Sequence, residues 1–359
     1  MNVSTFKKII LFIFFLYLFI LSIQLMGTSF KLMGKGFAEA LLRATSNPVA
    51  GLLIGILTTS VIQSSSTTTS IAVGFVAGGV LTLQGAIPII MGANIGTTIT
   101  SAIVSLGHIT RKGEFQRAFG AAIVHEFFNI LAVIILFPLE MTTHLLEKSA
   151  TALSNAFIGM GGIEFLSPLK LMTKPVTDLI EKAIPIPAFL LLGALALLFF
   201  SLVKMVKTMR SLLLVKFEIF LDKYLFKNDL TAFLLAVIVT ATIQSSSITT
   251  SLVIPLAGAG LLTIRKIFPY TLGANVGTTI TAMLASFATL NPIALTLAFV
   301  HLLFNLFGII IIYPFKKIPI WLAETSARIA AESRRNTIIF LIFYFFFRLT
   351  PLIYLLIVK

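Results

Sequence analysis

The chain has 359 residues, of which 58% are hydrophobic and only 11% are charged. Because soluble proteins carry about 25% charged residues, this composition excludes an ordinary soluble domain. A helix needs about 20 apolar residues to cross a bilayer, and the chain contains several runs of that length. It contains no cysteine, which excludes disulfide bonds, thiol catalysis and metal sites with cysteine ligands. The sequence therefore predicts an all-α polytopic membrane protein.

The net charge of +14 does not indicate a nucleic-acid partner. The lysine and arginine residues lie mostly in short segments beside apolar runs, where the positive-inside rule places them on the cytoplasmic side. Lys7 and Lys8 precede the first run, and Lys204 and Lys207 belong to a cluster that follows the fourth. We therefore expect a multi-pass protein of the plasma (inner) membrane with a cytoplasmic N-terminus.

Seven apolar runs are long enough to be full membrane spans. They cover residues 9–26, 84–106, 115–137, 186–206, 265–288, 292–314 and 338–357. After the first run, residues 27–48 carry Lys31, Lys35 and Arg43. This segment is expected to be an amphipathic helix on the membrane surface.

Two further apolar stretches, 48–81 and 229–261, are longer than one span, and a run of hydroxyl residues interrupts each of them. A helix that faces lipid gains nothing from such a run. Non-helical backbone at membrane depth is stable only where protein buries it or a water-filled cavity receives it. We therefore predict two re-entrant hairpins, each made of two short helices with the hydroxyl run at its tip.

Two motifs occur twice along the chain. QSSSTTTS at Gln63–Ser70 recurs as QSSSITTS at Gln244–Ser251, and GANIGTTIT at Gly92–Thr100 recurs as GANVGTTIT at Gly273–Thr281, both at an offset of 181 residues. Each half would cross the membrane three times, an odd number, so the second half must be inverted relative to the first. Secondary transporters are built on such inverted repeats, with the substrate site at broken helices near the bilayer midplane.

The duplication divides the chain into four parts. Residues 1–140 are predicted to form the first inverted repeat and 186–315 the second, with an external connecting loop over 141–185. Residues 316–359 are predicted to form a cytoplasmic linker and a last transmembrane helix.

The hydroxyl tips predict an anion site. At each tip the second helix of the hairpin begins with unpaired N–H groups and the positive end of its dipole, an arrangement that suits phosphate. Serine hydroxyls and glutamine amides add neutral donors, and a coupled cation can supply the missing positive charge for the time of transport. The predicted phosphate-binding residues are Gln63, Ser64, Ser65, Ser66, Gln244, Ser245, Ser246 and Ser247.

Uncharged oxygens near the tips suit a hard cation such as sodium. The GANxGTT segments supply Asn94, Thr97, Asn275, Thr278 and Thr281 as candidate sodium ligands. Their glycine residues also permit close backbone approach, so a helix-packing face is an alternative role for the same segments. We expect no cofactor and no metal other than sodium as the coupling ion.

Glu126 lies inside a predicted span, where an acidic side chain is costly and is a functional candidate by default. It is expected to be a sodium ligand or a proton-sensitive carboxylate. The motif His125-x-x-Phe-Asn129 recurs as His301-x-x-Phe-Asn305, and Leu302 stands in the place of Glu126. The two histidines are expected to pack or to form hydrogen bonds rather than to bind metal.

Arg348 lies inside the last predicted span. It is expected to extend towards the membrane surface or to pair locally.

These motifs resemble the type II sodium-dependent phosphate cotransporter family, and the chain looks like a bacterial member. The likeness covers about residues 50–140 and 230–315, including the run Arg117–Glu140. The resemblance implies sodium-driven phosphate uptake, with phosphate held by the two QSSS tips. It also implies sodium sites near the second GANxGTT copy and the VH(D/E)xFN segment, which correspond here to Thr278, Thr281, Glu126 and Asn129. Family members that transport net charge usually carry aspartate at the position of Glu126, so the sodium stoichiometry stays open.

Two other functions compete with transport. Ion channels also use re-entrant loops, but they usually build the pore from identical subunits around an axis, whereas the duplication here lies within one chain. An intramembrane enzyme with a serine nucleophile would need a base, and neither serine motif contains histidine or lysine. We therefore predict a sodium-coupled phosphate symporter and no enzyme. The predicted partners are phosphate, sodium and the lipid bilayer; the sequence leaves the oligomeric state open.

Overall fold

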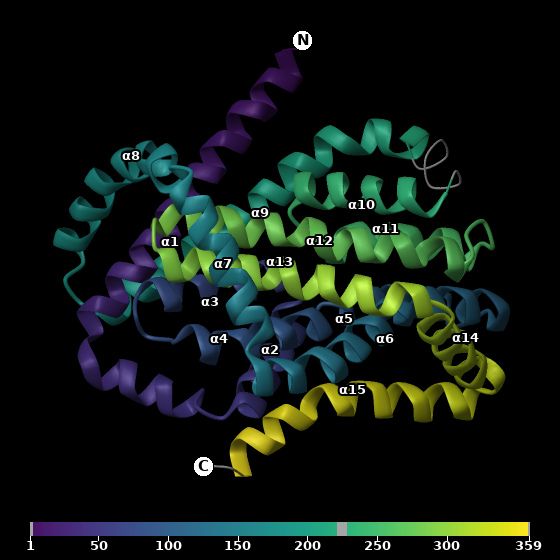
Figure 1. Ribbon diagram of the computed structural model, residues 1–359. Coiled ribbons are helices and arrows are strands. Elements are labelled where there is room, and N and C mark those ends of the chain that lie inside the picture. Colours follow the sequence, from purple (N-terminus) through teal and green to yellow (C-terminus); the bar gives the residue numbers. More distant parts are fainter. Residues whose placement is uncertain (1–2, 221–227, 358–359) are drawn as a thin grey trace.

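The computed structural model describes residues 3–220 and 228–357, and within these ranges it contains helices and no strand (Figure 1). The first half comprises α1 (Val3–Ala44), α2 (Pro48–Ile62), α3 (Ser65–Ala77), α4 (Leu83–Gly96), α5 (Ile99–Ser105), the short η1 (Leu106–His108) and α6 (Lys112–Thr143). The second half comprises α9 (Pro187–Phe220), α10 (Asp229–Ile243), α11 (Ser246–Gly258), α12 (Ile264–Thr289) and α13 (Pro292–Ile312). The connecting and final elements are α7 (Leu145–Gly159), α8 (Gly162–Ala183), η3 (Tyr313–Phe315), α14 (Lys317–Glu332) and α15 (Arg334–Ile357).

Within the described residues, five helices are long and apolar enough to cross a membrane. They are Phe6–Met33, Leu83–His108, Lys112–Thr143, Pro187–Thr208 and Pro292–Phe315. This confirms the prediction of an all-α polytopic membrane protein. The other two predicted spans, 265–288 and 338–357, form parts of α12 and α15 and are not among the five.

Each predicted hairpin is a pair of short helices joined at its QSSS tip. The first arm α2 begins at Asn47, whose side chain accepts from the next backbone amides, and Pro48 occupies the first helical position. The first arm α10 begins with a capping box at Asn228. These stop and start signals set where each hairpin begins.

Three segments differ from the expectation. The segment 27–48 is not a separate surface helix, because α1 continues to Ala44 and the first strong break is the cap at Asn47–Pro48. The predicted connecting loop folds into α7 and α8. The predicted span 84–106 lies within the candidate span Leu83–His108, but a two-residue turn at Thr97–Thr98 separates α4, which ends at Gly96, from α5, which begins at Ile99.

The glycines of GANxGTT allow helices to pack backbone against backbone. A Cβ atom on Gly92 would lie 2.0 Å from the carbonyl oxygen of Leu52 on α2, and one on Gly273 would lie 2.1 Å from that of Phe233 on α10. Helices in a bilayer associate through such close contacts rather than through the hydrophobic effect. The helix-packing role of these segments is therefore confirmed in both halves.

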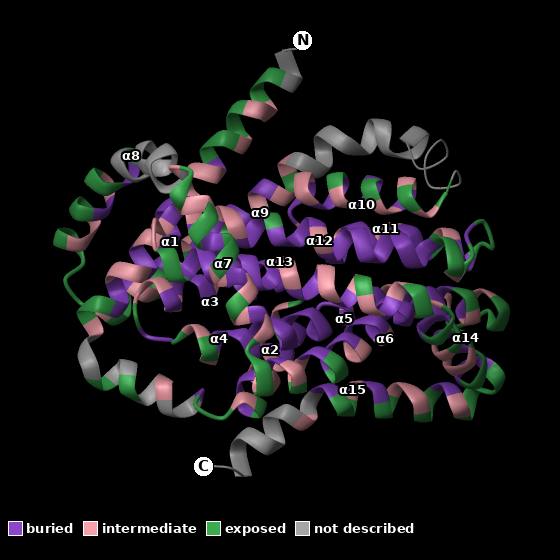
Figure 2. Cartoon of the chain, viewed as in Figure 1, coloured by how far each residue is buried: buried purple, intermediate pink, exposed green. Residues whose placement is uncertain are grey.

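The second arm of each hairpin packs on the other half of the molecule. The arm α3 contacts α12 and α13, and α11 contacts α5 and α6. Figure 2 shows the buried residues gathered along these central helices, with exposed residues on outer helices such as α15. Because of this exchange, the two tips lie in the interior of the molecule.

Candidate functional site

The two tips have the same local backbone. Gln63 and Gln244 end the first arms in the left-handed region, at φ of 58° and 64°. Ser64 and Ser245 follow in an extended conformation and cap the second arms, accepting from the backbone amides three residues ahead. A left-handed residue is a common way for a helix to end, and His144 and Leu290 end α6 and α12 in the same way. At the tips it turns the chain from the first arm into the second.

The tips contact each other through a reciprocal pair of hydrogen bonds. The hydroxyl of Ser66 donates to the carbonyl oxygen of Gln244 over 3.1 Å, and the hydroxyl of Ser247 donates to that of Gln63 over 3.3 Å. The two donors, Ser66 and Ser247, are 181 residues apart, and so are the two acceptors, Gln63 and Gln244. The duplication is therefore expressed as a pseudo-twofold contact between the N-terminal ends of α3 and α11.

A cavity of about 470 Å³ lies at this contact. It is lined by six of the eight predicted phosphate-binding residues, which are Gln63, Ser64, Ser66, Gln244, Ser245 and Ser247. Its remaining wall comes largely from α9, including Phe199, Val203 and the exposed side chain of Lys207. A lysine that the sequence assigned to a loop cluster thus lies beside the tips.

The remaining tip residues are buried in the surrounding packing. Ser65 and Ser246 are the first residues of α3 and α11, and both are buried. The Ser65 hydroxyl lies 3.1 Å from that of Thr97. The two glutamines differ, since Gln63 is exposed and Gln244 is only 4% exposed.

A series of hydrogen bonds through three asparagines connects the two halves behind the tips. Asn275 accepts from Nε2 of His125 over 2.5 Å and donates to the side-chain oxygen of Asn129 over 2.7 Å. Asn129 donates in turn to the carbonyl oxygen of Asn94 over 2.6 Å. The structure therefore brings together three of the predicted sodium-binding residues, and His125 forms a hydrogen bond as expected.

The equivalent cluster of the second half lacks these bonds. Both ring nitrogens of His301 and the side-chain oxygen of Asn305 are buried and make no hydrogen bond among the described residues. The hydroxyl oxygen of Thr281 is likewise buried without a partner there. Buried polar atoms are normally satisfied, so unpaired oxygens at this depth are candidates for an ion or water.

The two GANxGTT threonines have different partners. Thr97, in the gap between α4 and α5, places its hydroxyl 3.1 Å from Ser65 and 3.3 Å from Ser247, so it contacts both tips. Its counterpart Thr278 lies within the unbroken helix α12 and donates to the carbonyl oxygen of Ala274 in the same helix. The predicted sodium ligands are therefore not equivalent in the two halves.

Glu126 and Arg348 form an ion pair. The carboxylate Oε1 of Glu126 lies 2.7 Å from Nη2 of Arg348, and the two residues are 7% and 2% exposed. The expectation that Arg348 extends to the membrane surface or pairs locally is wrong, because its partner lies 222 residues away in the sequence. The opposite charges attract strongly in an interior of low dielectric constant.

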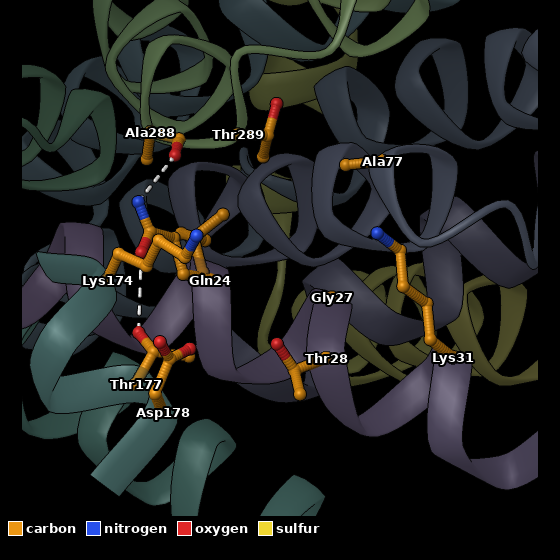
Figure 3. A pocket seen from close by; sticks show the side chains of 11 residues that line it. Gln24, Gly27, Thr28, Lys31, Ala77, Lys174, Thr177, Asp178, Ala288 and Thr289 are labelled. Carbon is orange, nitrogen blue, oxygen red and sulfur yellow. Dashed lines mark hydrogen bonds between the residues drawn. The ribbon is translucent and has the colours of Figure 1, made fainter. Parts of the chain in front are cut away.

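A separate cavity of about 210 Å³ lies where α1, α8 and the end of α12 meet (Figure 3). Gln24 spans it, donating to the carbonyl oxygen of Ala288 and accepting from the hydroxyl of Thr177. Lys31, Lys174 and Asp178 also line it, so it presents both signs of charge. It shares no lining residue with the cavity at the tips, and we assign it no role in binding.

A profile of the family described as Na+/Pi-cotransporter matches residues 18–173 and 197–320, more than half of the chain. The chain belongs to this family. Both QSSS tips and both GANxGTT segments lie within the matched residues, whereas α15 lies beyond them.

The chain is also similar in sequence to curated proteins that are named as sodium-dependent phosphate transport proteins. The chain is 33% identical over 439 residues to sodium-dependent phosphate transport protein 2B of Homo sapiens, covering 94% of this chain and 64% of that protein. It is 33% identical over 424 residues to protein 2A of Ovis aries, covering 95% and 66%, and 34% identical to protein 2B of Mus musculus, covering 96% and 64%. The chain thus spans about two thirds of the length of these relatives. No solved structure matches it.

Two residues that the sequence did not assign to the site lie beside the predicted site residues in the structure. Lys207 was counted only as a loop charge, and nothing in its local sequence indicates that α9 lines the tips. For Arg348 a signal was present, because Glu126 and Arg348 are opposite charges inside predicted spans, and such residues usually pair.

Proposed function

We propose that the chain is a sodium-coupled symporter of inorganic phosphate that works by alternating access, with phosphate bound between the two QSSS tips. The observation that carries the proposal is the reciprocal contact of Ser66 with Gln244 and of Ser247 with Gln63. It brings the N-termini of two hairpin helices to one cavity, and a helix N-terminus favours an anion.

The chemistry of the cavity suits a tetrahedral oxyanion. Two helix dipoles point their positive ends at it, and serine hydroxyls and glutamine amides donate hydrogen bonds without a fixed charge. Lys207 adds a positive charge on the α9 wall, which favours an anion in the cavity by electrostatic attraction. A site built mostly of neutral donors binds phosphate and still releases it.

Sodium is proposed to bind behind the tips. Asn94, Asn129 and Asn275 lie in one hydrogen-bonded chain, and Thr97 touches both tips. In the second half, Thr278 and the unpartnered oxygen of Thr281 supply further uncharged oxygens. Sodium bound here would neutralise phosphate charge at short range, which couples the two substrates.

The exchanged hairpin arms support alternating access. Since α3 packs on α12 and α13 while α11 packs on α5 and α6, a movement of one half carries part of both tips with it. Inverted repeats give two such arrangements, one open to each side of the membrane. We propose a plasma (inner) membrane location with a cytoplasmic N-terminus, an orientation that places Lys207 and its cavity towards the cytoplasm.

Radiolabelled phosphate uptake into proteoliposomes tests the proposal, with sodium and membrane voltage varied independently. The double variant Ser66→Ala/Ser247→Ala removes the two hydroxyls that line the cavity and form the reciprocal contact. Each lost donor costs about 1–3 kcal/mol, so we expect uptake at low phosphate to fall by about 100-fold.

Ser29→Ala/Ser286→Ala is the matched control, because both hydroxyls donate to carbonyl oxygens of their own helices. It is expected to transport like the wild type. Near-normal uptake by the tip variant would refute the site, and unitary currents in the absence of phosphate would favour a channel instead.

A further inference from the structure

The last helix inserts a buried arginine into the first repeat. From α15, Nη1 of Arg348 donates to the carbonyl oxygens of Ile95 and Gly96 over 2.9 and 3.4 Å, and Nη2 donates to the hydroxyl of Thr98 over 2.7 Å. These are the residues at which α4 ends. A positive charge at the C-terminal end of a helix stabilises the freed carbonyl groups.

The same guanidinium also holds Glu126. Nη2 of Arg348 lies 2.7 Å from Oε1 of Glu126, and it also donates to the hydroxyl of Tyr344, whose ring lies below the guanidinium. Both charges are buried, and a charge at this depth is tolerated only when it is paired. Glu126 therefore already has a counter-ion, and that counter-ion is covalently part of the chain.

The second half of the sequence has no equivalent of Glu126, and its GANxGTT segment has no turn for an arginine to bind. Leu302 stands where Glu126 would be, and α12 continues unbroken through the second GANxGTT copy. Among the described residues, the carboxylate, the arginine and the turn at Thr97–Thr98 thus occur together in the first half only. Their joint occurrence indicates one charge-balanced unit rather than a carboxylate prepared for a mobile ion.

We infer that Arg348 is a tethered counter-ion that takes the place of a coupled cation at Glu126. In consequence Glu126 binds no sodium, and each phosphate is accompanied by one positive charge fewer than in a carrier with a free carboxylate at this position. This inference rests on the proposed sodium–phosphate symport. Oε2 of Glu126 is buried and makes no hydrogen bond among the described residues. A sodium ion at either carboxylate oxygen would nevertheless lie close to the guanidinium, and like charges repel strongly in a buried site.

The experiment measures the charge moved per phosphate and the sodium Hill coefficient in proteoliposomes for the wild type, Arg348→Gln, Arg348→Lys and Glu126→Gln/Arg348→Gln. In Arg348→Gln the freed carboxylate is expected to recruit sodium, which raises the charge per phosphate by about one. Arg348→Lys retains a positively charged side chain and is expected to move the same charge per phosphate as the wild type. The double variant replaces the ion pair by two neutral groups and is also expected to keep the wild-type charge and Hill coefficient.

A double variant that moves about one charge fewer than the wild type would overturn the inference, because Glu126 would then have been a sodium ligand. An unchanged charge per phosphate in folded Arg348→Gln would also overturn it, because a purely structural arginine changes stability and not coupling. If Arg348→Gln does not fold, the double variant decides alone, since it leaves no unpaired buried charge. Arg335→Gln, an exposed site on the same helix, is the control for the loss of one positive charge.

Failure of the proposed function gives a different result, namely no sodium-dependent phosphate uptake by the wild type. The thermal midpoint of the purified protein in sodium against choline then tests Glu126 without transport. Sodium is expected to stabilise Arg348→Gln more than the wild type. Equal stabilisation of the two proteins would overturn the inference.

Discussion

The two GANxGTT segments have almost the same sequence and different structures. In GANIGTT a two-residue turn at Thr97 and Thr98, whose backbone stays in the right-handed helical region, separates α4 from α5, whereas GANVGTT lies within the single helix α12. They differ by one conservative substitution, Ile95 against Val276, which does not break a helix. The turn is instead matched to Arg348, which binds the carbonyl oxygens of Ile95 and Gly96.

This difference teaches that a duplicated motif can serve two purposes. The interruption places Thr97 against both tips, while the intact helix keeps the hydroxyl of Thr278 on its own backbone. The features that the halves share are the left-handed turns at the tips and the glycine contacts, which build the scaffold. The features that differ surround the charges and the proposed ion sites.

The largest expected effect tests the shared scaffold. In Gly92→Ala and Gly273→Ala the new Cβ atom would lie 2.0 and 2.1 Å from backbone oxygens. Each variant is expected to lose about 3 kcal/mol or more of stability, because the backbone cannot yield like a side chain. The yield of monodisperse protein and its thermal midpoint measure this.

Gly107→Ala is the control, because no atom lies within 4 Å of its added Cβ. It is expected to behave like the wild type. A wild-type thermal midpoint for Gly92→Ala or Gly273→Ala would contradict the close packing at that glycine. A lower midpoint for only one of them would show that the packing is not equivalent in the two halves.

An intermediate effect tests the difference between the two threonines. Thr97→Val removes a hydroxyl that contacts both tips, and we expect the KM for phosphate to rise by about 5- to 10-fold. Thr278→Val is expected to raise the half-saturating sodium concentration and to leave the phosphate KM at saturating sodium unchanged. Uptake titrations against each substrate separate the two outcomes.

Thr271→Val serves as the control, since this buried hydroxyl also donates only to its own helix. Equal rises in the phosphate KM for Thr97→Val and Thr278→Val would show that the turn does not distinguish the two halves.

The smallest expected effect concerns the helices that begin the two repeats. Met26 of α1 packs tightly over Gly74 of α3, whereas α9 leaves a cavity that Lys207 lines. Lys207→Gln is expected to raise the phosphate KM by about 2- to 3-fold at low ionic strength, and added choline chloride should abolish the difference by screening.

Lys204→Gln on the same helix is the control, because Lys204 does not line the cavity. If the rise in the phosphate KM of Lys207→Gln does not depend on salt, or if Lys204→Gln raises the KM equally, Lys207 does not contribute to the site electrostatically.

Much of the site could be predicted from the sequence because its signals are local or repeated. A hydroxyl run at membrane depth needs burial, so Gln63 and Gln244 could be assigned to tips without coordinates. The only sequence signal for the pairing of Glu126 with Arg348 is that they are opposite charges inside predicted spans. The hydrogen bonds that hold the pair could not be predicted, since no spacing or periodicity joins residues 222 positions apart. The position of Lys207 depends on how α9 packs, and its sequence neighbourhood is that of an ordinary loop lysine.

The sequence by itself determined the membrane class, the two hairpins and the position of their tips, because composition, cap residues and duplication act through neighbouring residues. Only the tertiary structure decided which tip atoms meet, where α4 ends and which cation pairs with Glu126. The physical reason is that buried polar groups and charges must find partners, and those partners are supplied by whichever helix packs nearby. For the first repeat that helix is α15, which stands outside the duplicated sequence.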